Sequence, residues 1–208
     1  ICPELENCVG DTSIALSQIA DDNQFFEVKA EYAKDMVTGF IRLNGATVGC
    51  VANRSEIYNE EGEKTDSFDN VLSARGCKKA AEFVKFCDAF EIPVLTLTNV
   101  KGYKATKCSE ANMARNAAEL TSAFISATVP KVNVVIGQAF GSAYLTMNSK
   151  STGADMVFAW PSAQIGMMDA KLAAKIMYAD ADIATVNEKA AEYAMLQSSA
   201  MSAAKRGY

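Results

Sequence analysis

The sequence predicts an α/β fold with a largely parallel sheet and crossover helices. Two β-rich runs, 36–43 and 47–52, are joined by Asn44-Gly45, which between alternating strands is the strongest short signal for a β-hairpin. After this hairpin, strand-like runs alternate with long helical patterns. The turns at 99–103 and 137–143 follow consecutive strands. Both are expected at the carboxyl ends of those strands, where open α/β sheets bind ligands.

The first part of the chain combines a polar lead-in, the hairpin and a long helix. Residues 1–24 are polar and mixed, with a short helix expected near 12–19. After the hairpin, residues 53–69 are polar and acidic, and we expect a solvated surface loop there. Apolar positions then recur at helical spacing, which predicts a helix over 70–90. These positions are Ala74, Cys77, Ala81, Val84, Phe86 and Ala89.

A strand, a loop and a second long helix follow. Pro93 starts a strand at 94–98, and the loop after it holds Gly102 and Tyr103. The helix is predicted over 109–127, with Ser109 as its N-terminal cap. Pro130 then ends the helical segment because proline is not accommodated inside a helix.

The stretch from 131 to 169 is the most informative part of the chain. A β-rich apolar run, 132–136, is expected to break at Gly137, and Gly141-Ser142-Ala143 opens an expected helix over 144–150. Free backbone N–H groups face outward where a strand turns into a helix, and small residues let a ligand approach the main chain. Such a turn can hold an oxyanion without a charged side chain.

Two short strands and two Ala-rich helices complete the pattern. The strands are expected at 156–159 and 163–165, on either side of Trp160-Pro161. The helices are expected at 170–178 and 186–204. Trp160 is interpreted as a packing residue, because nothing around it indicates chemistry.

Composition excludes several classes of protein. The 208 residues suit one domain with a sizeable core, or two small domains, and the net charge is −5, from 20 Lys+Arg and 25 Asp+Glu. No basic block is present, which argues against a nucleic-acid partner. No apolar stretch approaches the ~20 residues of a membrane span, and no signal peptide is visible.

Cysteine usage and the lack of histidine argue against a metal site. The chain has no histidine and no CxxC pair among its six cysteines, so a zinc site is not expected. Cys50, Cys77 and Cys87 sit in apolar patterns and are expected to be buried free thiols, which predicts a reducing cytoplasm. An enzyme with this sequence would also lack the usual general base.

Several motifs in order resemble one family. The segment IADDNQFFEV (19–28), followed by YAKDMVTGFIRLNGATVGCVAN (32–53), resembles the opening of the C-terminal half of acyl-CoA carboxyltransferases. Residues 80–103 resemble their helix–strand–loop containing D-V-P-G-F, and 127–171 resemble the block A-T-V-P-K to A-W-P-x-A-x-I. The match runs over roughly 19–204. Members include the beta subunits of biotin-dependent carboxylases and the alpha subunits of sodium-pumping decarboxylases.

The resemblance implies a crotonase-like fold, a superhelix of ββα units within the α/β class. A full member has two halves: the first mainly binds acyl-CoA, and the second mainly receives carboxybiotin. Residues 1–208 are expected to form the second half as a single domain, truncated at both ends relative to the full protein. The isolated domain is then expected to be inactive.

The chain departs from the family pattern at four places. The D-V-P-G-F motif stands as Asn99-Val100-Lys101-Gly102-Tyr103, and KATKCSEANMARNAAEL (104–120) replaces a glycine-rich helix entry. Ser142 replaces the second glycine of the G-G-A turn, and Asp169 replaces a later glycine. These departures bear on substrate identity and activity more than on the fold.

Carboxyl transfer by biotin requires stabilisation of two developing oxyanions, the ureido oxygen of biotin and the enolate oxygen of the thioester. Backbone N–H pairs suit both, and a biotin nitrogen can take the acyl α-proton, so histidine is not needed. The first candidate donors, and the biotin-binding residues, are Ser142 and Ala143 with Gly141. The second candidates are Gly102 and Tyr103. Without the resemblance, both sites would be interpreted as ordinary turns.

Other roles follow from the same resemblance. Tyr144 and Leu145 are the substrate-binding candidates, with Leu145 helping to select the acyl chain; the alternative for Leu145 is a core residue. Expected partners are acyl-CoA, a separate carrier protein bearing biotin, the N-terminal half and further copies of the chain. No biotin is expected to be covalently attached here, and a membrane would be involved only through a sodium-pump complex.

Two other functions remain open from the sequence. The first is a different crotonase-like acyl-CoA enzyme, such as a hydratase or thioester hydrolase, which would require Asp or Glu beside the oxyanion turn. The residues after the turn, Ala143 to Thr146, supply none. The second is a non-catalytic domain kept for assembly of the complex.

Overall fold

The computed structural model describes residues 5–59 and 61–208, and within them the main layer is a sheet of seven strands. The order is β1-β2-β3-β7-β9-β10, and β11 pairs with the far end of β9. Pairing is antiparallel from β1 to β3 and parallel from β3 onward, which confirms the predicted α/β class. The strands are β1 (Phe26–Glu27), β2 (Met36–Leu43), β3 (Ala46–Asn53), β7 (Val94–Val100), β9 (Lys131–Phe140), β10 (Met156–Ala159) and β11 (Gln164–Gly166).

The β2–β3 hairpin forms where the sequence predicts it. Asn44 and Gly45 have φ angles of 52° and 80°, and Leu43 pairs with Ala46 across the turn. Positive φ at both central residues is the requirement of a type I′ turn, which matches the twist of the flanking strands.

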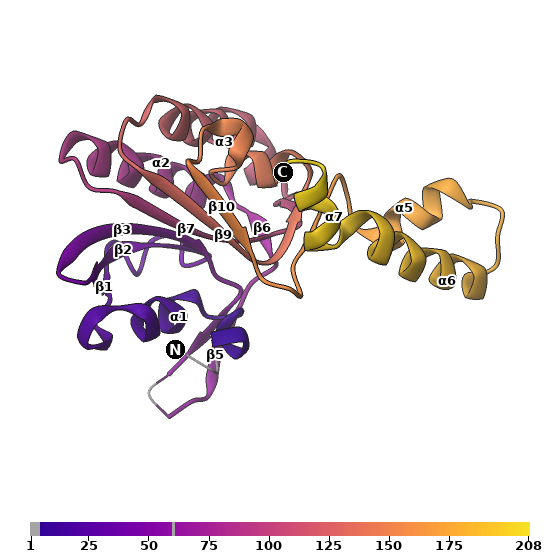
Figure 1. The fold of residues 1–208 in the computed structure, drawn as a ribbon, viewed down its shortest axis with the longest axis horizontal. Coiled ribbons are helices and arrows are strands. Elements are labelled where there is room, and N and C mark those ends of the chain that lie inside the picture. Colours follow the sequence, from indigo (N-terminus) through magenta and orange to yellow (C-terminus); the bar gives the residue numbers. More distant parts are fainter. Residues whose placement is uncertain (1–4, 60) are drawn as a thin grey trace.

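Helices cover both faces of the sheet. Helices α2 (Ala74–Ala89) and α3 (Lys107–Ser126) pack side by side on one face, and α1 (Thr12–Ile19) lies on the other (Figure 1). The larger core cluster lies between α2, α3 and the sheet, and it includes Leu120, Phe124 and Val84. A smaller cluster around Leu16 and Ile41 lies beneath α1. Within the described residues, no helix is both long and apolar enough to cross a membrane.

Side-chain caps fix the starts of α2 and α3. The Ser73 hydroxyl accepts a hydrogen bond from the Gly76 N–H at 3.0 Å. For α3 the cap is Thr106, whose Oγ1 accepts from the Ser109 N–H at 3.2 Å. The prediction of Ser109 as the cap was therefore wrong, because threonine three residues earlier occupies the capping position and the helix starts at Lys107.

Two segments differ from their predicted structure for identifiable reasons. Within 53–69, expected to be a loop, β4 (Glu56–Tyr58) and β5 (Lys64–Ser67) form an antiparallel hairpin with little apolar burial, and an ion pair between Lys64 and Glu56 lies across it. Strand β9 does not break at Gly137 but continues to Phe140. A Cβ at Gly137 would lie 2.5 Å from Asn99 Oδ1, so glycine there accommodates a neighbouring side chain instead of ending the strand.

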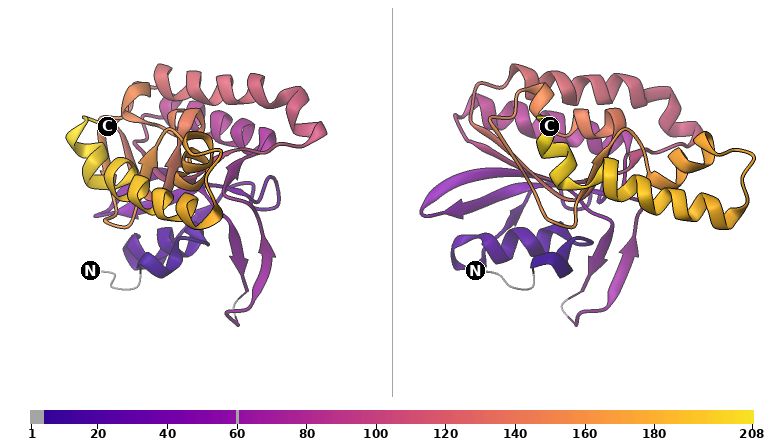
Figure 2. Two further views of the ribbon diagram at one scale, coloured as in Figure 1. Left: turned by 90° about the vertical axis from the view of Figure 1, so that its right-hand side faces the viewer. Right: turned by 45° about the vertical axis from the view of Figure 1, so that its right-hand side comes forward.

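The C-terminal helices form an arm beside the sheet. Helix α5 (Ala170–Met177) packs against α6 (Ile183–Tyr193), and the pair projects from the body of the molecule (Figures 1 and 2). A π-helical turn, Ala194–Ser198, and a short helix, α7 (Ala200–Lys205), return the chain to the sheet. The single helix predicted over 186–204 is thus divided, because Ser199 adopts an extended conformation and caps a new helix.

Three cysteines are buried free thiols, as predicted. Cys50, Cys77 and Cys87 lie in the core, and burial raises the pKa of the Cys77 and Cys87 thiols to about 12. Cys108 is exposed, and Cys2 lies outside the described residues.

Candidate active site

The first candidate oxyanion turn lies where β9 ends and α4 (Gly141–Thr146) begins. Phe140 precedes the helix and offers no side-chain cap, and the first N–H groups of a helix have no intrahelical partner. The first N–H groups of α4, at Gly141, Ser142 and Ala143, therefore have no partner within the helix, and these are the candidate donors selected from the sequence. The helix was predicted over 144–150; it starts three residues earlier and stops at Thr146, and Asn148 then has a left-handed φ of 53°.

Gly141 is required by the backbone at this turn. Its φ is +58°, a left-handed conformation that side chains other than glycine adopt at a cost. A Cβ at this position would also lie 3.1 Å from the Met167 carbonyl oxygen. Two independent constraints therefore fix the residue from which α4 starts.

Side chains on α4 divide into a buried and an exposed set. Ala143 and Tyr144 are 1% and 4% exposed and pack into the larger core cluster, and burial raises the pKa of the Tyr144 phenol. Ser142 and Leu145 are exposed. Because Ala143 is fixed by packing, its N–H is held in a defined direction.

A hollow of about 460 Å³, called here the α4 hollow, lies beside this turn. Gly141, Ser142, Tyr144 and Leu145 all line it, so the structure brings four of the predicted site residues together. Ala143 lies buried behind them. The other walls come from β11, the loop after it and the end of the chain, including Ile165, Met167, Gln197 and Arg206. The lining contains no Asp or Glu among the described residues.

The second candidate turn lies outside the α4 hollow. Gly102 and Tyr103 form a two-residue strand, β8, that pairs in parallel with β6 (Val71–Leu72). The Tyr103 hydroxyl lies 2.9 Å from Thr146 Oγ1, and that oxygen donates to the Ser142 carbonyl at 3.1 Å. One buried threonine thus joins the two turns.

Thr146 is a residue that the sequence did not single out. It is 4% exposed and also lies 3.3 Å from the Thr121 hydroxyl on α3. The only sequence signal was a polar residue four positions after Ser142, which is the spacing of neighbours on a helix face. That signal does not identify the partner from β8.

Amide side chains hold the carboxyl ends of the central strands together. Asn99 Oδ1 accepts a hydrogen bond from the Gln138 N–H at 2.9 Å, and the Asn99 N–H donates to Asn53 Oδ1 at 3.4 Å. Asn99 lies between Thr98 and Val100, where the β7–β9 register shifts, and is 5% exposed. Asn99, at the position of the family's aspartate, therefore stabilises the sheet end beneath the site.

Trp160 and Asp169, both considered in the sequence, have structural roles, as does Asp155. Trp160 packs against both core clusters, as expected. Asp155 accepts a hydrogen bond from the Lys131 N–H at 2.7 Å. Asp169 caps α5 by accepting from the N–H groups of Lys171 and Leu172 at 3.0 and 3.2 Å.

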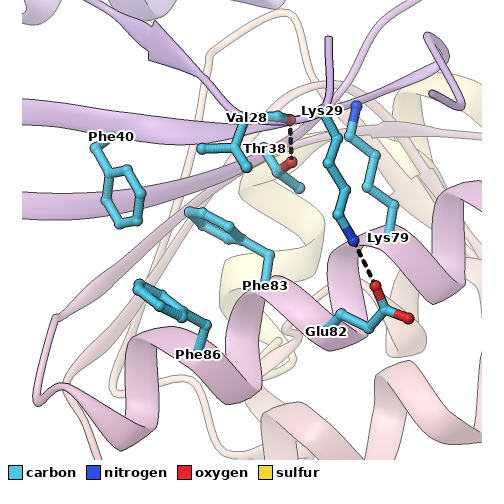
Figure 3. A pocket seen from close by; sticks show the side chains of 8 residues that line it. All are labelled: Val28, Lys29, Thr38, Phe40, Lys79, Glu82, Phe83 and Phe86. Atoms are coloured by element: carbon cyan, nitrogen blue, oxygen red, sulfur yellow. Dashed lines mark hydrogen bonds and ion pairs between the residues drawn. The ribbon is translucent and has the colours of Figure 1, made fainter. Parts of the chain in front are cut away.

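A smaller hollow of about 320 Å³ lies between β2 and α2 (Figure 3). Phe40, Phe83 and Phe86 form its apolar wall, and Lys29 pairs with Glu82 beside it. The Lys79 side chain also lines this hollow, and its Nζ donates to the Met36 carbonyl at 2.7 Å. Lys79 is 1% exposed, and burial lowers its pKa to about 8.

Comparison with known proteins identifies the family. The model of the carboxyl transferase domain matches residues 1–207. The chain is 39% identical to the propionyl-CoA carboxylase beta chain of Roseobacter denitrificans over 179 residues, covering 86% of this chain and 33% of that protein. It is 38% identical to the methylmalonyl-CoA carboxyltransferase 12S subunit of Propionibacterium freudenreichii subsp. shermanii over 204 residues. That match covers 95% of this chain and 37% of the 12S subunit.

Solved structures agree with this assignment. A crystal structure of the transcarboxylase 12S hexamer with hydrolysed methylmalonyl-coenzyme A superposes with a TM-score of 0.87 at 38% identity, covering 98% of this chain and 40% of that one. The fold is therefore crotonase-like, as the resemblance implied. The chain spans between 33% and 40% of the length of these relatives. On the sequence motifs, the α4 turn and these matches, the chain belongs to the carboxyl transferase domain family.

Proposed function

We propose that this chain is the C-terminal, biotin-binding half of a carboxyltransferase that moves a carboxyl group between biotin and an acyl-CoA. The observation that carries the proposal is the uncapped N-terminus of α4, which opens beside the α4 hollow. The relatives named above are carboxylase and carboxyltransferase subunits, which supports the same reaction class.

The α4 hollow suits the head group of biotin. A ureido oxygen needs hydrogen-bond donors and no counter-charge, and the N–H groups of Ser142 and Ala143, with Gly141, are such donors. Leu145, Ile165 and Met167 supply apolar walls for a neutral ring. When bound, biotin supplies the carboxyl group and a ring nitrogen that accepts the acyl α-proton. Among the described residues, no group of three or more His, Cys, Asp or Glu side chains is placed to hold a metal ion.

The chain's own residues position the reactants and stabilise the negative charge that develops during transfer. The backbone donors are held in place by Gly141 and the buried Ala143, so they need not reorient when negative charge develops. This preorganisation is the main source of oxyanion stabilisation. Gly102 and Tyr103 are the proposed second pair of donors, tied to α4 through Thr146. Tyr144 contributes to the wall, and Leu145, 40% exposed, is proposed to contact the acyl chain.

The complete reaction requires partners. We expect an N-terminal half for acyl-CoA, a separate carrier protein bearing biotin, and further copies of the chain, in a cytoplasmic assembly; this chain alone should not transfer carboxyl groups. Large apolar side chains exposed on α5, α6 and the turn after them support self-association. They are Leu172, Ile176, Met177, Ile183, Met195 and Leu196. A related 12S protein is described as a hexamer with substrate bound.

The test is to remove one backbone donor in the complete enzyme. Ala143→Pro eliminates an N–H in the first turn of α4, where proline is tolerated in principle. Loss of one oxyanion donor costs about 10²–10³ in kcat. The matched control is Ala184→Pro, in the first turn of α6 and outside the site. Circular dichroism establishes that both variants fold. A folded Ala143→Pro enzyme with near wild-type carboxyl transfer would show that the turn is only structural.

A different crotonase-like enzyme is less well supported. Hydration or thioester hydrolysis needs a carboxylate near the oxyanion donors, and the described lining of the α4 hollow offers none. An assay of hydration with unsaturated acyl-CoA distinguishes this alternative.

A further inference from the structure

A polar hollow of about 570 Å³ lies where α2 and α3 begin, and is called here the α2–α3 hollow. It is separate from the α4 hollow, because the two share no lining residue among those described. Lys104, which directly follows Tyr103 in the chain, forms part of its wall. The hollow therefore adjoins the second candidate turn.

Four cationic side chains line the α2–α3 hollow: Arg75 and Lys78 from α2, Lys104 from the loop, and Arg115 from α3. All four are exposed. Among the described residues, Arg75, Lys104 and Arg115 form no ion pair, and the nearest carboxylate recorded for Lys78 is Glu82 at 4.0 Å. The described chain thus holds four positive charges around one hollow without close ion pairs, and part of that charge is compensated by Glu119, whose carboxyl pKa is lowered first by Lys85 and then by Lys78 and Arg115.

Among the described residues, two carboxylates line the same hollow, against four cations. Glu119 is paired with Lys85 at 2.7 Å, which lowers the pKa of its carboxyl. Asp35 forms no ion pair with any of the four cations in the described chain. The hollow therefore keeps a net positive charge.

The two helix ends reinforce this charge. Ser73 and Ala74 at the start of α2, and Thr106 and Cys108 at the start of α3, lie in the wall. Each cap hydroxyl satisfies one N–H, at Gly76 and Ser109, while the earlier N–H groups have no partner within the helix. Helix N-termini carry partial positive charge and favour anions.

We propose that the α2–α3 hollow binds a phosphate-bearing ligand, with Arg75 and Arg115 as its main contacts. Guanidinium groups bind phosphate oxygens bidentately, and several cations around one site match a ligand with two or more negative charges. The proposal goes beyond carboxyl transfer, because this hollow contains no group assigned to that reaction. Lys104 and Arg115 belong to the segment 104–120 that departs from the family pattern.

The first test is calorimetric titration of the protein with inorganic pyrophosphate. The double variant Arg75→Ala/Arg115→Ala should bind at least about tenfold more weakly, because two charge-assisted contacts are lost. The matched control, Arg42→Ala, removes an exposed arginine on β2 and should leave the affinity unchanged. Thermal melts verify folding, and Arg115→Lys, which keeps the charge, should retain more binding than Arg115→Ala. Absence of pyrophosphate binding, or equal loss in Arg42→Ala, would overturn the proposal.

The second test locates the ligand within the hollow. Cys108 is exposed and lines it, so pyrophosphate should slow alkylation of Cys108 by iodoacetamide, measured by mass spectrometry on its peptide. Alkylation at an unchanged rate under saturating pyrophosphate would place the anion elsewhere and refute the assignment.

Competition separates two sources of phosphate. Displacement of pyrophosphate by coenzyme A but not by pantetheine would identify the nucleotide end of an acyl-CoA as the ligand. Failure of coenzyme A to compete would identify a free phosphorylated effector instead. The pyrophosphate titration and the competition titration measure binding and not turnover. An absence of carboxyl transfer would therefore not be confused with an absence of phosphate binding at the α2–α3 hollow.

Discussion

Replacing Gly141 by alanine tests whether the start of α4 is as constrained as the structure indicates. The left-handed φ of +58° costs a non-glycine residue roughly 1–2 kcal/mol. The added Cβ also meets the Met167 carbonyl at 3.1 Å, so that either the loop or α4 must shift by a few tenths of an ångström. We expect a loss of about 2–3 kcal/mol in the free energy of unfolding, measured by urea denaturation.

Gly45 provides the matched control for this variant. Its φ is +80°, but a Cβ there meets nothing within 4 Å. Gly45→Ala should therefore lose only the backbone contribution, about 1–2 kcal/mol. The excess loss in Gly141→Ala measures the contact with Met167. In the complete enzyme, Gly141→Ala should also reduce kcat about tenfold or more by displacing the donors, whereas Gly45→Ala should not. Equal stability losses, or full activity in Gly141→Ala, would refute this reasoning.

The remaining predictions concern Thr146, Lys79 and self-association. Thr146→Val should lower kcat with little change in KM and lower the free energy of unfolding by about 1–3 kcal/mol, because the Tyr103 hydroxyl loses a hydrogen-bond partner. Thr146→Ser keeps the hydroxyl and should restore both kcat and stability. If Thr146→Ser restores neither, Thr146 does not link the two turns. The folded pKa of Lys79, about 8, lies below its unfolded value of 10.5, so the unfolded chain holds the proton more strongly between those values. The free energy of unfolding of the wild type minus that of Lys79→Met should therefore rise by about 3 kcal/mol between pH 8 and pH 10.5, measured by denaturation at a series of pH values. If this difference does not change with pH, the Lys79 amine is not destabilised in its charged form by burial. Sedimentation should show oligomers, and a strictly monomeric chain at high concentration would contradict the exposed apolar arm.

Local signals in the sequence predicted the elements whose causes are local. The β2–β3 hairpin follows from the conformational freedom of Asn44 and Gly45 alone, and β10 has its predicted bounds, 156–159. Gly137 was misread because its role is not local. The residue makes room for Asn99 of another strand, and nothing in the neighbouring sequence indicates that contact. The β4–β5 hairpin was missed for a related reason, since cross-strand ion pairing leaves no apolar alternation.

The site was predicted only in part for the same reason. Small residues after a strand indicated that a helix opens at Gly141, Ser142 and Ala143, because that signal lies within one turn, and their role as donors stays a prediction. The link from Tyr103 through Thr146 joins residues 43 positions apart and depends on how β8 meets α4. Likewise, Arg75 and Arg115 line one hollow only because the start of α2 packs against α3 near Asn116.

The structure accounts for two departures of this sequence from its family pattern. The proposed donors at α4 are main-chain N–H groups, so the serine at 142, whose side chain is exposed, need not alter them. Asp169, in place of a glycine, caps α5 and stabilises its first turn. The residues least able to change should then be those that fix the backbone. They are Gly141, because of its φ angle, and Gly137, because of its contact with Asn99. If the proposed oxyanion donors are right, these two glycines preserve the backbone geometry that those donors require, while the side chains around them are free to diverge.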